Sequence, residues 1–143
     1  HLEIYPKKNI YSCEKSLDYL QICGCRDRVD YEKYFYDFSI YAEKMRQVQK
    51  IVQTDNFRVG FLLCSNEKIE LKHFQKFKIF LSSNHPFEDM YELSRCNYII
   101  GPPSTYSMWA SFVGNVPLCI IENKEQYIAD LSSFRVIGIN AQQ

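Results

Sequence analysis

The stretch that decides the fold runs from Asp89 to Gly114 and reads DMYELSRCNYIIGPPSTYSMWASFVG. It predicts a short amphipathic helix, a strand over residues 97–100, a Gly-Pro-Pro turn and a second helix that begins at Ser104. The short apolar run is typical of a strand buried on both faces of a parallel sheet. The two prolines allow neither strand nor helix to continue, so the chain must turn between the strand and the second helix.

The second helix predicts an anion site. Ser104 is a suitable N-cap, and four apolar residues follow at helical spacing, with Gly114 predicted as the residue just past the helix end: Met108, Trp109, Phe112 and Val113. The first amides of a helix lack acceptors within it and lie at the positive end of its dipole. A diphosphate could bind there, with added hydroxyl donors from Ser104, Thr105 and Ser107. The alternative is an ordinary capped helix whose hydroxyls satisfy only their own backbone.

The rest of the chain alternates between helical and strand patterns. Helices are expected from Ser39, as N-cap, to about Gln53 and over residues 86–95, with a further helical stretch within 68–74. Strands are expected over three other segments, residues 58–64, 78–81 and 118–122. This alternation indicates a Rossmann-like α/β fold, a parallel sheet with helices on both faces.

Such sheets bind ligands beyond the carboxyl ends of their strands. Three segments are expected at this rim: Ser65-Asn66, Ser82-Ser83 and residues 101–104. Ser65 therefore joins the candidate binding residues.

Residues 1–30 show little periodicity, and only Ser16 to Ile22 suggest a short helix. We expect an uncertain or diverged N-terminal segment over 1–30 and a single α/β domain over 31–143, with residues 140–143 frayed. The chain begins at His1 without a methionine, so a piece of a longer protein is one interpretation.

Charge and hydropathy exclude several classes of protein. The 17 basic and 17 acidic residues give a net charge of zero, and no basic block is present, which argues against nucleic acid or an anionic membrane surface as the partner. No apolar run approaches the roughly 20 residues that span a bilayer, and the pattern of a signal peptide is absent. A cytoplasmic location, at most peripheral to a membrane, is the expectation.

The six cysteines are Cys13, Cys23, Cys25, Cys64, Cys96 and Cys119. Those in apparent strands or helix ends are expected to be buried reduced thiols, which favours a reducing compartment. Zinc bound by Cys13, Cys23 and Cys25 is an alternative, but paired spacings with histidines are lacking, and a disulfide is another alternative. No metal site is predicted.

Three segments resemble a known family. They are CNYIIGPPSTYSMWASFVGNVPL (residues 96–118), KYFYDFSIYAEKM (33–45) and FLLCSNEKIEL (61–71). Taken in chain order, they are similar to the family 11 glycosyltransferases, the α-1,2-fucosyltransferase-like proteins. The resemblance covers about residues 31–122.

The resemblance implies the C-terminal half of a two-domain GT-B fold, which holds the donor substrate GDP-fucose and needs no cofactor. It implies that Asp89 contacts the guanine edge and that Ser104 and Thr105 meet the β-phosphate. A residue that only favours the helix dipole is the alternative for Asp89. For Trp109 a core position beside Val113 is expected in preference to base stacking.

The chain departs from the family in its arginine motif, which reads H-x-R-R-x-D. The local candidate is residues 25–30, CRDRVD, where only Arg28 and Asp30 match. Arg28, or Arg26, is the candidate cation for the departing diphosphate. The alternative is a pair of surface charges neutralised by neighbouring aspartates. A second alignment that begins the motif at His1 loses both arginines.

The expected reaction is an inverting, metal-independent transfer of fucose from GDP-fucose to a sugar hydroxyl of a glycan acceptor. No general base is identified. An acceptor domain is expected to be missing, so the isolated chain should have little activity. Two alternatives stay open: a degenerate domain that binds a nucleotide sugar or a partner without catalysis, and a generic α/β domain for another phosphate ligand.

Overall fold

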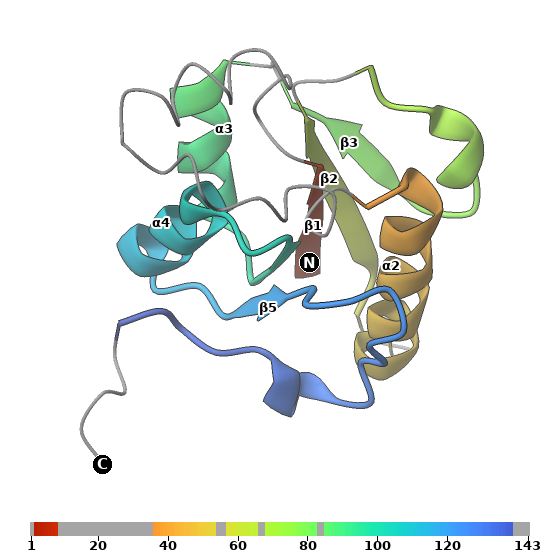
Figure 1. Cartoon of the computed structure of the whole chain (residues 1–143). Helices are drawn as coiled ribbons and strands as arrows, with labels where there is room; N and C mark the ends of the chain where they lie inside the picture. The colour runs from red at the N-terminus through yellow and green to blue at the C-terminus, as the bar shows by residue number, and fades with distance from the viewer. Residues whose placement is uncertain (1, 9–35, 54–56, 66–67, 83–84, 139–143) are drawn as a thin grey trace, which may run out of the picture.

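The computed structural model describes residues 2–8, 36–53, 57–65, 68–82 and 85–138. They form a parallel five-stranded sheet with the strand order β3-β2-β1-β4-β5 (Figure 1). The strands are β1 (Leu2–Lys8), β2 (Val59–Ser65), β3 (Ile79–Leu81), β4 (Tyr98–Gly101) and β5 (Leu118–Ile120).

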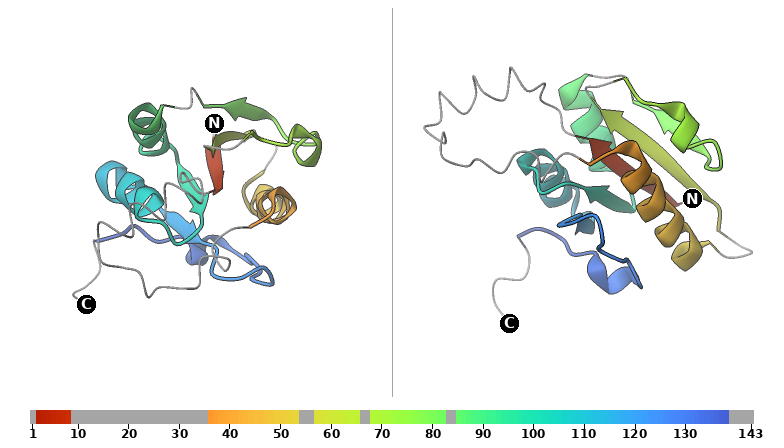
Figure 2. Two further views of the ribbon diagram at one scale, coloured as in Figure 1. Left: turned by 45° about the horizontal axis from the view of Figure 1, so that its top comes forward. Right: turned by 45° about the vertical axis from the view of Figure 1, so that its right-hand side comes forward.

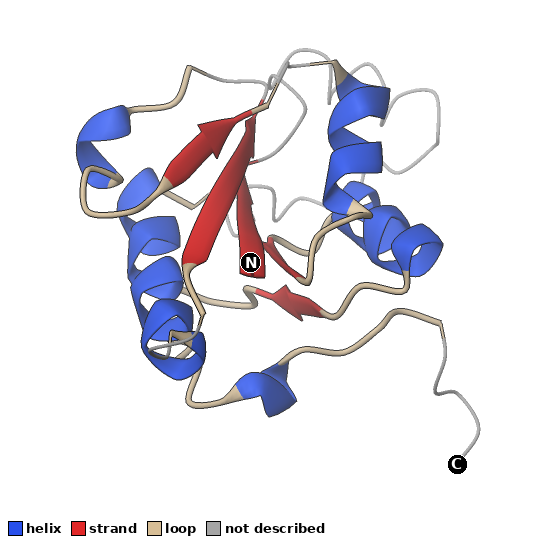
Figure 3. Ribbon diagram, turned by 180° about the vertical axis from the view of Figure 1, so that it is seen from behind, coloured by secondary structure: helices blue, strands red, loops and turns tan. Residues whose placement is uncertain are grey.

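Helices cover both faces of this sheet. Helix α2 (Phe38–Val52) packs on one face, and α3 (Pro86–Leu93) and α4 (Thr105–Gly114) lie together on the other, as Figures 2 and 3 show from further directions. Two short 3-10 turns, η2 (Leu71–His73) and η3 (Leu131–Ser133), complete the described elements. The predicted α/β fold class is confirmed, with parallel strands between two helical layers.

The core alternates between the two faces because successive side chains of a strand point in opposite directions. In β2, Phe61 and Leu63 join the α2 side of the core, whereas Leu62 and Cys64 join the side of α3 and α4. All seven residues of β2 are buried. The continuous apolar run in the sequence therefore indicates a strand that is covered on both faces.

The central strand is the element that the sequence did not predict. β1 pairs in parallel with β2 on one side and with β4 on the other. It lies in the segment 1–30, where the sequence shows no strand pattern, because LEIYPKK contains charged residues and a proline in place of an apolar run. The expected helix over Ser16 to Ile22 and the frayed residues 140–143 lie outside the described residues.

Three helix boundaries differ from prediction. The N-cap of α2 is Asp37, whose side chain accepts a hydrogen bond from the Ser39 amide at 2.8 Å, so Ser39 lies inside the helix. Of the helical stretch expected within residues 68–74, only η2 is helical. Helix α4 includes Gly114, and Asn115 takes the left-handed conformation at its end, with φ 53°.

The cysteines in the described residues are Cys64, Cys96 and Cys119, and all three are buried, as expected. Burial raises the pKa of the Cys119 thiol to about 11. The zinc and disulfide alternatives rest on Cys13, Cys23 and Cys25, which lie outside the described residues. None of the helices described is long and apolar enough to cross a membrane.

A buried lysine of α2 forms hydrogen bonds with the loop that follows β5. The Lys44 ammonium group, 2% exposed, donates to the backbone carbonyls of Lys124, at 3.1 Å, and Gln126. One helical turn further along α2, the Gln47 side chain accepts from the Ile128 amide at 2.9 Å. Burial lowers the pKa of Lys44 because it disfavours the charged form.

Lys44→Met is expected to lower the free energy of unfolding by about 1–3 kcal/mol, since two carbonyl groups lose their donor. Because the pKa of Lys44 is lowered in the folded state, the unfolded chain binds this proton more tightly than the folded chain does. The free energy of unfolding of the wild type therefore increases as pH rises toward the ordinary lysine pKa of 10.5. Urea unfolding from pH 7 to 9.5 should therefore show a growing cost of the substitution. Lys50→Met, at an exposed lysine of α2, is the control and should change stability by at most about 0.5 kcal/mol. If the stability cost of Lys44→Met instead decreased as pH rises, the pKa of Lys44 would not be lowered by folding.

Candidate functional site

The strand order changes direction at the centre of the sheet. From β1 the chain goes on to β2 and β3 on one side, and then returns to β4 and β5 on the other. In such sheets the point where the direction reverses, here between β1 and β4, opens at the carboxyl ends of the strands and binds ligands. Those ends are Lys8 and Gly101, and Gly101 leads through two prolines to the start of α4.

The turn after β4 brings the strand end close to the first turn of α4. A Cβ atom on Gly101 would lie 2.7 Å from Ser107 Oγ, so only a glycine fits without displacing that hydroxyl. Ser104 is the N-cap, as predicted, and its side chain accepts from the Ser107 amide at 3.3 Å. The hydroxyl groups of Ser104 and Ser107 also lie 3.2 Å apart. The cap and the strand end therefore form one tightly packed unit.

The three hydroxyl residues of this turn have different access to solvent. Thr105 is exposed and Ser104 is half-buried, whereas Ser107 is fully buried. The Ser104 side chain accepts from the amide of Ser107, the third residue of α4. The amide of Thr105, the first residue of α4, has no acceptor within the helix. An anion at this helix end would meet Thr105 and Ser104, with Ser107 behind Ser104.

A second polar group lies at the start of α3. Asp89, in its first turn, is 5% exposed, and its Oδ2 accepts from the buried Ser82 hydroxyl at 3.0 Å. Ser82 directly follows β3, and its amide donates to the Leu63 carbonyl of β2. The other carboxyl oxygen of Asp89, Oδ1, is buried and has no hydrogen-bond partner among the described residues. Buried polar atoms are ordinarily paired, so this oxygen calls for a donor.

The two helix starts are tied to each other. The Tyr106 hydroxyl, in the first turn of α4, donates to the carbonyl of Pro86, the first residue of α3. Asp89 and Ser104 thus lie on neighbouring helix starts on the same face of the sheet, next to the carboxyl ends of the strands (Figure 1). No local signal in the sequence points to Tyr106, because its partner Pro86 is 20 residues away in the chain.

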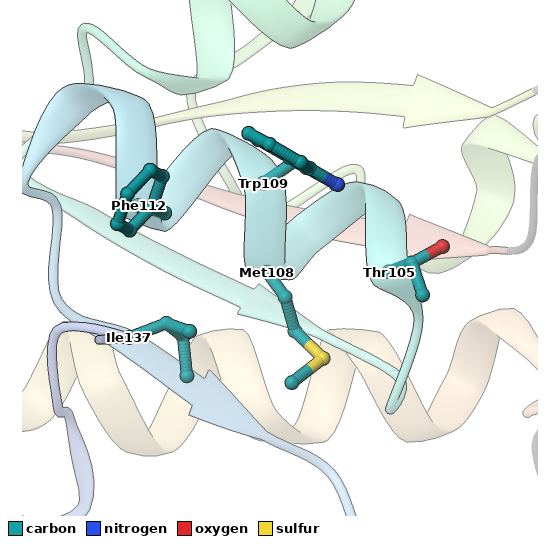
Figure 4. Close-up of a pocket in the computed structure, with 5 residues that line it drawn as sticks. All are labelled: Thr105, Met108, Trp109, Phe112 and Ile137. Carbon is teal, nitrogen blue, oxygen red and sulfur yellow. The ribbon is translucent and has the colours of Figure 1, made fainter. Parts of the chain in front are cut away.

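The expected core position of Trp109 is wrong. Its side chain is 56% exposed and meets Phe112 edge to face, with ring centroids 5.7 Å apart. Figure 4 shows the outer side of α4, where a hollow of about 350 Å³ is lined by Thr105, Met108, Trp109, Phe112 and Ile137. The sheet side of the helix instead holds Ser107 and Ser111, both fully buried.

The remaining predicted site residues are Ser65, Arg26 and Arg28. Ser65 is buried at the end of β2, and its neighbour Asn66 lies outside the described residues. Arg26 and Arg28, the candidate cations, also lie outside them. Among the side chains that the structure describes, no group of three His, Cys, Asp or Glu residues comes together as a metal site.

Comparison with known proteins supports the fold. No family model matches the chain, and no curated protein matches it. A similar solved structure is the NodZ α-1,6-fucosyltransferase co-crystallised with GDP, with a TM-score of 0.50 and 17% sequence identity. The match covers 85% of this chain and 38% of the NodZ chain, so this chain spans well under half the length of that protein. At this identity the likeness shows the fold alone: the chain has the parallel α/β fold of part of a fucosyltransferase.

Proposed function

We propose that this chain is the donor-binding domain of a fucosyltransferase-like glycosyltransferase and that GDP-fucose is its nucleotide sugar. The diphosphate would bind at the start of α4 and the guanine at the start of α3. The motifs that resemble family 11 glycosyltransferases and the fold shared with NodZ, which was crystallised with GDP, both support this assignment.

The phosphate half of the proposal rests on the turn after β4. Gly101 brings the strand end against the helix, and Ser104 and Thr105 lie at the positive end of the α4 dipole beside the switch point. Backbone amides and hydroxyl groups at such a position are suited to a diphosphate, whose oxygens accept hydrogen bonds.

The guanine half rests on Asp89, and this is the observation that carries the proposal. Guanine presents a ring N–H and an amino group side by side, and a carboxyl group accepts from such a pair. Ser82 already donates to Oδ2, while none of the described residues donates to the buried Oδ1. A base that donates to Oδ1 would supply what the described residues do not.

Transfer would then follow an inverting, metal-independent course. An acceptor hydroxyl oxygen forms a bond to the anomeric carbon of fucose while the bond from that carbon to the β-phosphate oxygen breaks, and the electron pair leaves with GDP. The helix start and an arginine, Arg28 or Arg26, would hold the growing negative charge. The acceptor would be a glycan hydroxyl, presented by a further domain.

Calorimetric titration of the chain with GDP, GDP-fucose, UDP and ADP tests the assignment. The wild type is expected to prefer the two guanine nucleotides. Asp89→Ala should weaken GDP binding about 10- to 100-fold and leave ADP and UDP nearly unchanged, since hydrogen bonds to a charged group are lost only for guanine. Ser104→Ala should weaken all four nucleotides about 3- to 10-fold, because every one carries a diphosphate.

Glu88→Ala is the matched control, since it removes the exposed neighbouring acid of the same helical turn. It should leave the order of affinities unchanged. Equal affinity of the wild type for all four nucleotides, or no binding of any, would contradict the proposal. Unfolding midpoints of the variants show whether a lost affinity reflects a lost fold.

A non-catalytic nucleotide-sugar-binding domain is the second candidate. The observation in its favour is the arginine motif, in which Cys25 replaces the histidine and Asp27 replaces the first arginine. The two candidates differ in what they do with GDP-fucose. A transferase domain, supplied with its acceptor domain, turns over GDP-fucose and loses this activity in Arg28→Ala. A binding domain binds GDP but does not turn over GDP-fucose.

A further inference from the structure

Helices α3 and α4 lie side by side with their N-termini at the same end (Figures 1 and 2). At their far ends the backbones are in direct contact, because a Cβ atom on Gly114 would lie 2.0 Å from the Ser94 carbonyl oxygen. At the rim of the sheet the hydroxyl of Tyr106 joins α4 to the Pro86 carbonyl. The helix pair is therefore held at both ends, by backbone contact at one and by a hydrogen bond at the other.

The position of this hydrogen bond relates it to the candidate site. Tyr106 follows Ser104 by two residues, and Pro86 precedes Asp89 in the first turn of α3. The tyrosine ring is 7% exposed, and Ala110, one turn further along the same side of α4, is fully buried. The hydroxyl thus links the element that carries the candidate guanine contact to the element that carries the candidate phosphate contact.

We propose that Tyr106 is a positioning residue that fixes the spacing between Asp89 and the start of α4, so that one nucleoside diphosphate engages both at once. The inference rests on the proposed function. Loss of the hydroxyl would leave the ring packed and would free the rim ends of the two helices to pivot about the contact between Gly114 and Ser94. The guanine half-site at Asp89 and the phosphate half-site at the start of α4 would each keep its own groups. The distance between the two half-sites would no longer match GDP.

Binding of two linked fragments depends on an effective concentration that the spacing of their half-sites sets. For this protein the fragments are guanosine and inorganic pyrophosphate, and the linked ligand is GDP. The product of the two fragment dissociation constants, divided by that of GDP, measures the effective concentration. A residue that acts only on spacing changes this ratio and leaves the fragment affinities alone.

The test compares the wild type with Tyr106→Phe by NMR titration of all three ligands. GDP affinity should fall about 3- to 10-fold, the worth of one hydrogen bond, while guanosine and pyrophosphate stay within about twofold. Independently of any ligand, the Asp89 amide, which donates to the His85 carbonyl in the first turn of α3, should exchange faster with solvent in Tyr106→Phe. The Ser94 amide, which donates to the Met90 carbonyl at the other end, should be unchanged.

Tyr36→Phe is the matched control. It also removes a buried tyrosine hydroxyl that donates to a backbone carbonyl, that of Ile121 at 3.1 Å, but this bond lies outside the pair of α3 and α4. The ratio should not change in this variant. If GDP binds the wild type and the Tyr106→Phe ratio is unchanged, or all three affinities fall in proportion, the positioning role is overturned and the proposed function stands. Absence of GDP binding by the wild type overturns both.

Discussion

Gly114→Ala is expected to lower the free energy of unfolding by about 3 kcal/mol, as overpacking against a fixed backbone does. The added Cβ would lie 2.0 Å from the Ser94 carbonyl oxygen and 2.7 Å from its Cα atom. Neither is a side-chain atom that can rotate away, so α3 and α4 must separate. Chemical denaturation of the purified chain measures the loss.

The sign of this result is diagnostic. Alanine is the better helix former, and in a helix whose glycine has open space around it the same substitution stabilises by about 0.5–1 kcal/mol. Val113→Ala, at the exposed neighbouring position, is the control and should cost less than about 1 kcal/mol. A Gly114→Ala variant as stable as the wild type would mean that the two helices are not in backbone contact.

Gly101→Ala is expected to disrupt the candidate phosphate site and to weaken GDP binding about tenfold. The new Cβ would lie 2.7 Å from Ser107 Oγ, and this hydroxyl is fully buried and lies 3.2 Å from Ser104 Oγ. Moving it disturbs the N-cap, whose loss costs about 1 kcal/mol. Calorimetry with GDP measures the affinity, and denaturation measures the stability.

A second substitution checks the cause. Ser107→Ala removes the clashing oxygen, and the new Cβ of residue 101 would then meet the Cβ of residue 107 at 3.4 Å, an ordinary contact. The double variant should therefore recover most of the stability lost in Gly101→Ala. If Ser107→Ala adds its own loss to that of Gly101→Ala, the two residues do not act through this contact.

The sequence identified the outer parts of the sheet and the start of α4 because their signals are local. The buried run of β2 and the Gly-Pro-Pro turn before Ser104 each depend on a few adjacent residues. β1 was missed because its place in the sheet depends on partners distant in the chain, the strands β2 and β4, and not on its own polar composition.

Trp109 shows a second limit of pattern reading. Helical spacing groups Met108, Trp109, Phe112 and Val113 as an apolar face, and the largest side chains of such a face are ordinarily taken as core. In α4 the buried side is instead formed by Tyr106, Ser107, Ala110 and Ser111. Ser111 donates to the Val116 carbonyl at 2.6 Å and accepts from the Ile137 amide at 3.2 Å, so its polarity is satisfied inside. Helical spacing alone therefore does not tell which side of an apolar helix is buried.

The candidate site could be predicted from the sequence only in part. The resemblance points to Asp89 and helix capping points to Ser104, each on its own. Their proximity depends on the Tyr106 hydroxyl and on the backbone contact at Gly114, and both are long-range contacts.

The central place of β1 has a consequence for the order in which the molecule is assembled. This strand leaves the ribosome before the rest of the sheet, yet its neighbour β4 is made only after most of the chain described here. Until then β1 has at most one partner, and the sheet is open along its middle. Closure joins segments that are far apart in sequence, which is slow because a large loop must be ordered first. Folding should therefore be a late, cooperative event, and a chain interrupted before β4 should leave the edge of β1 available for association with other strands.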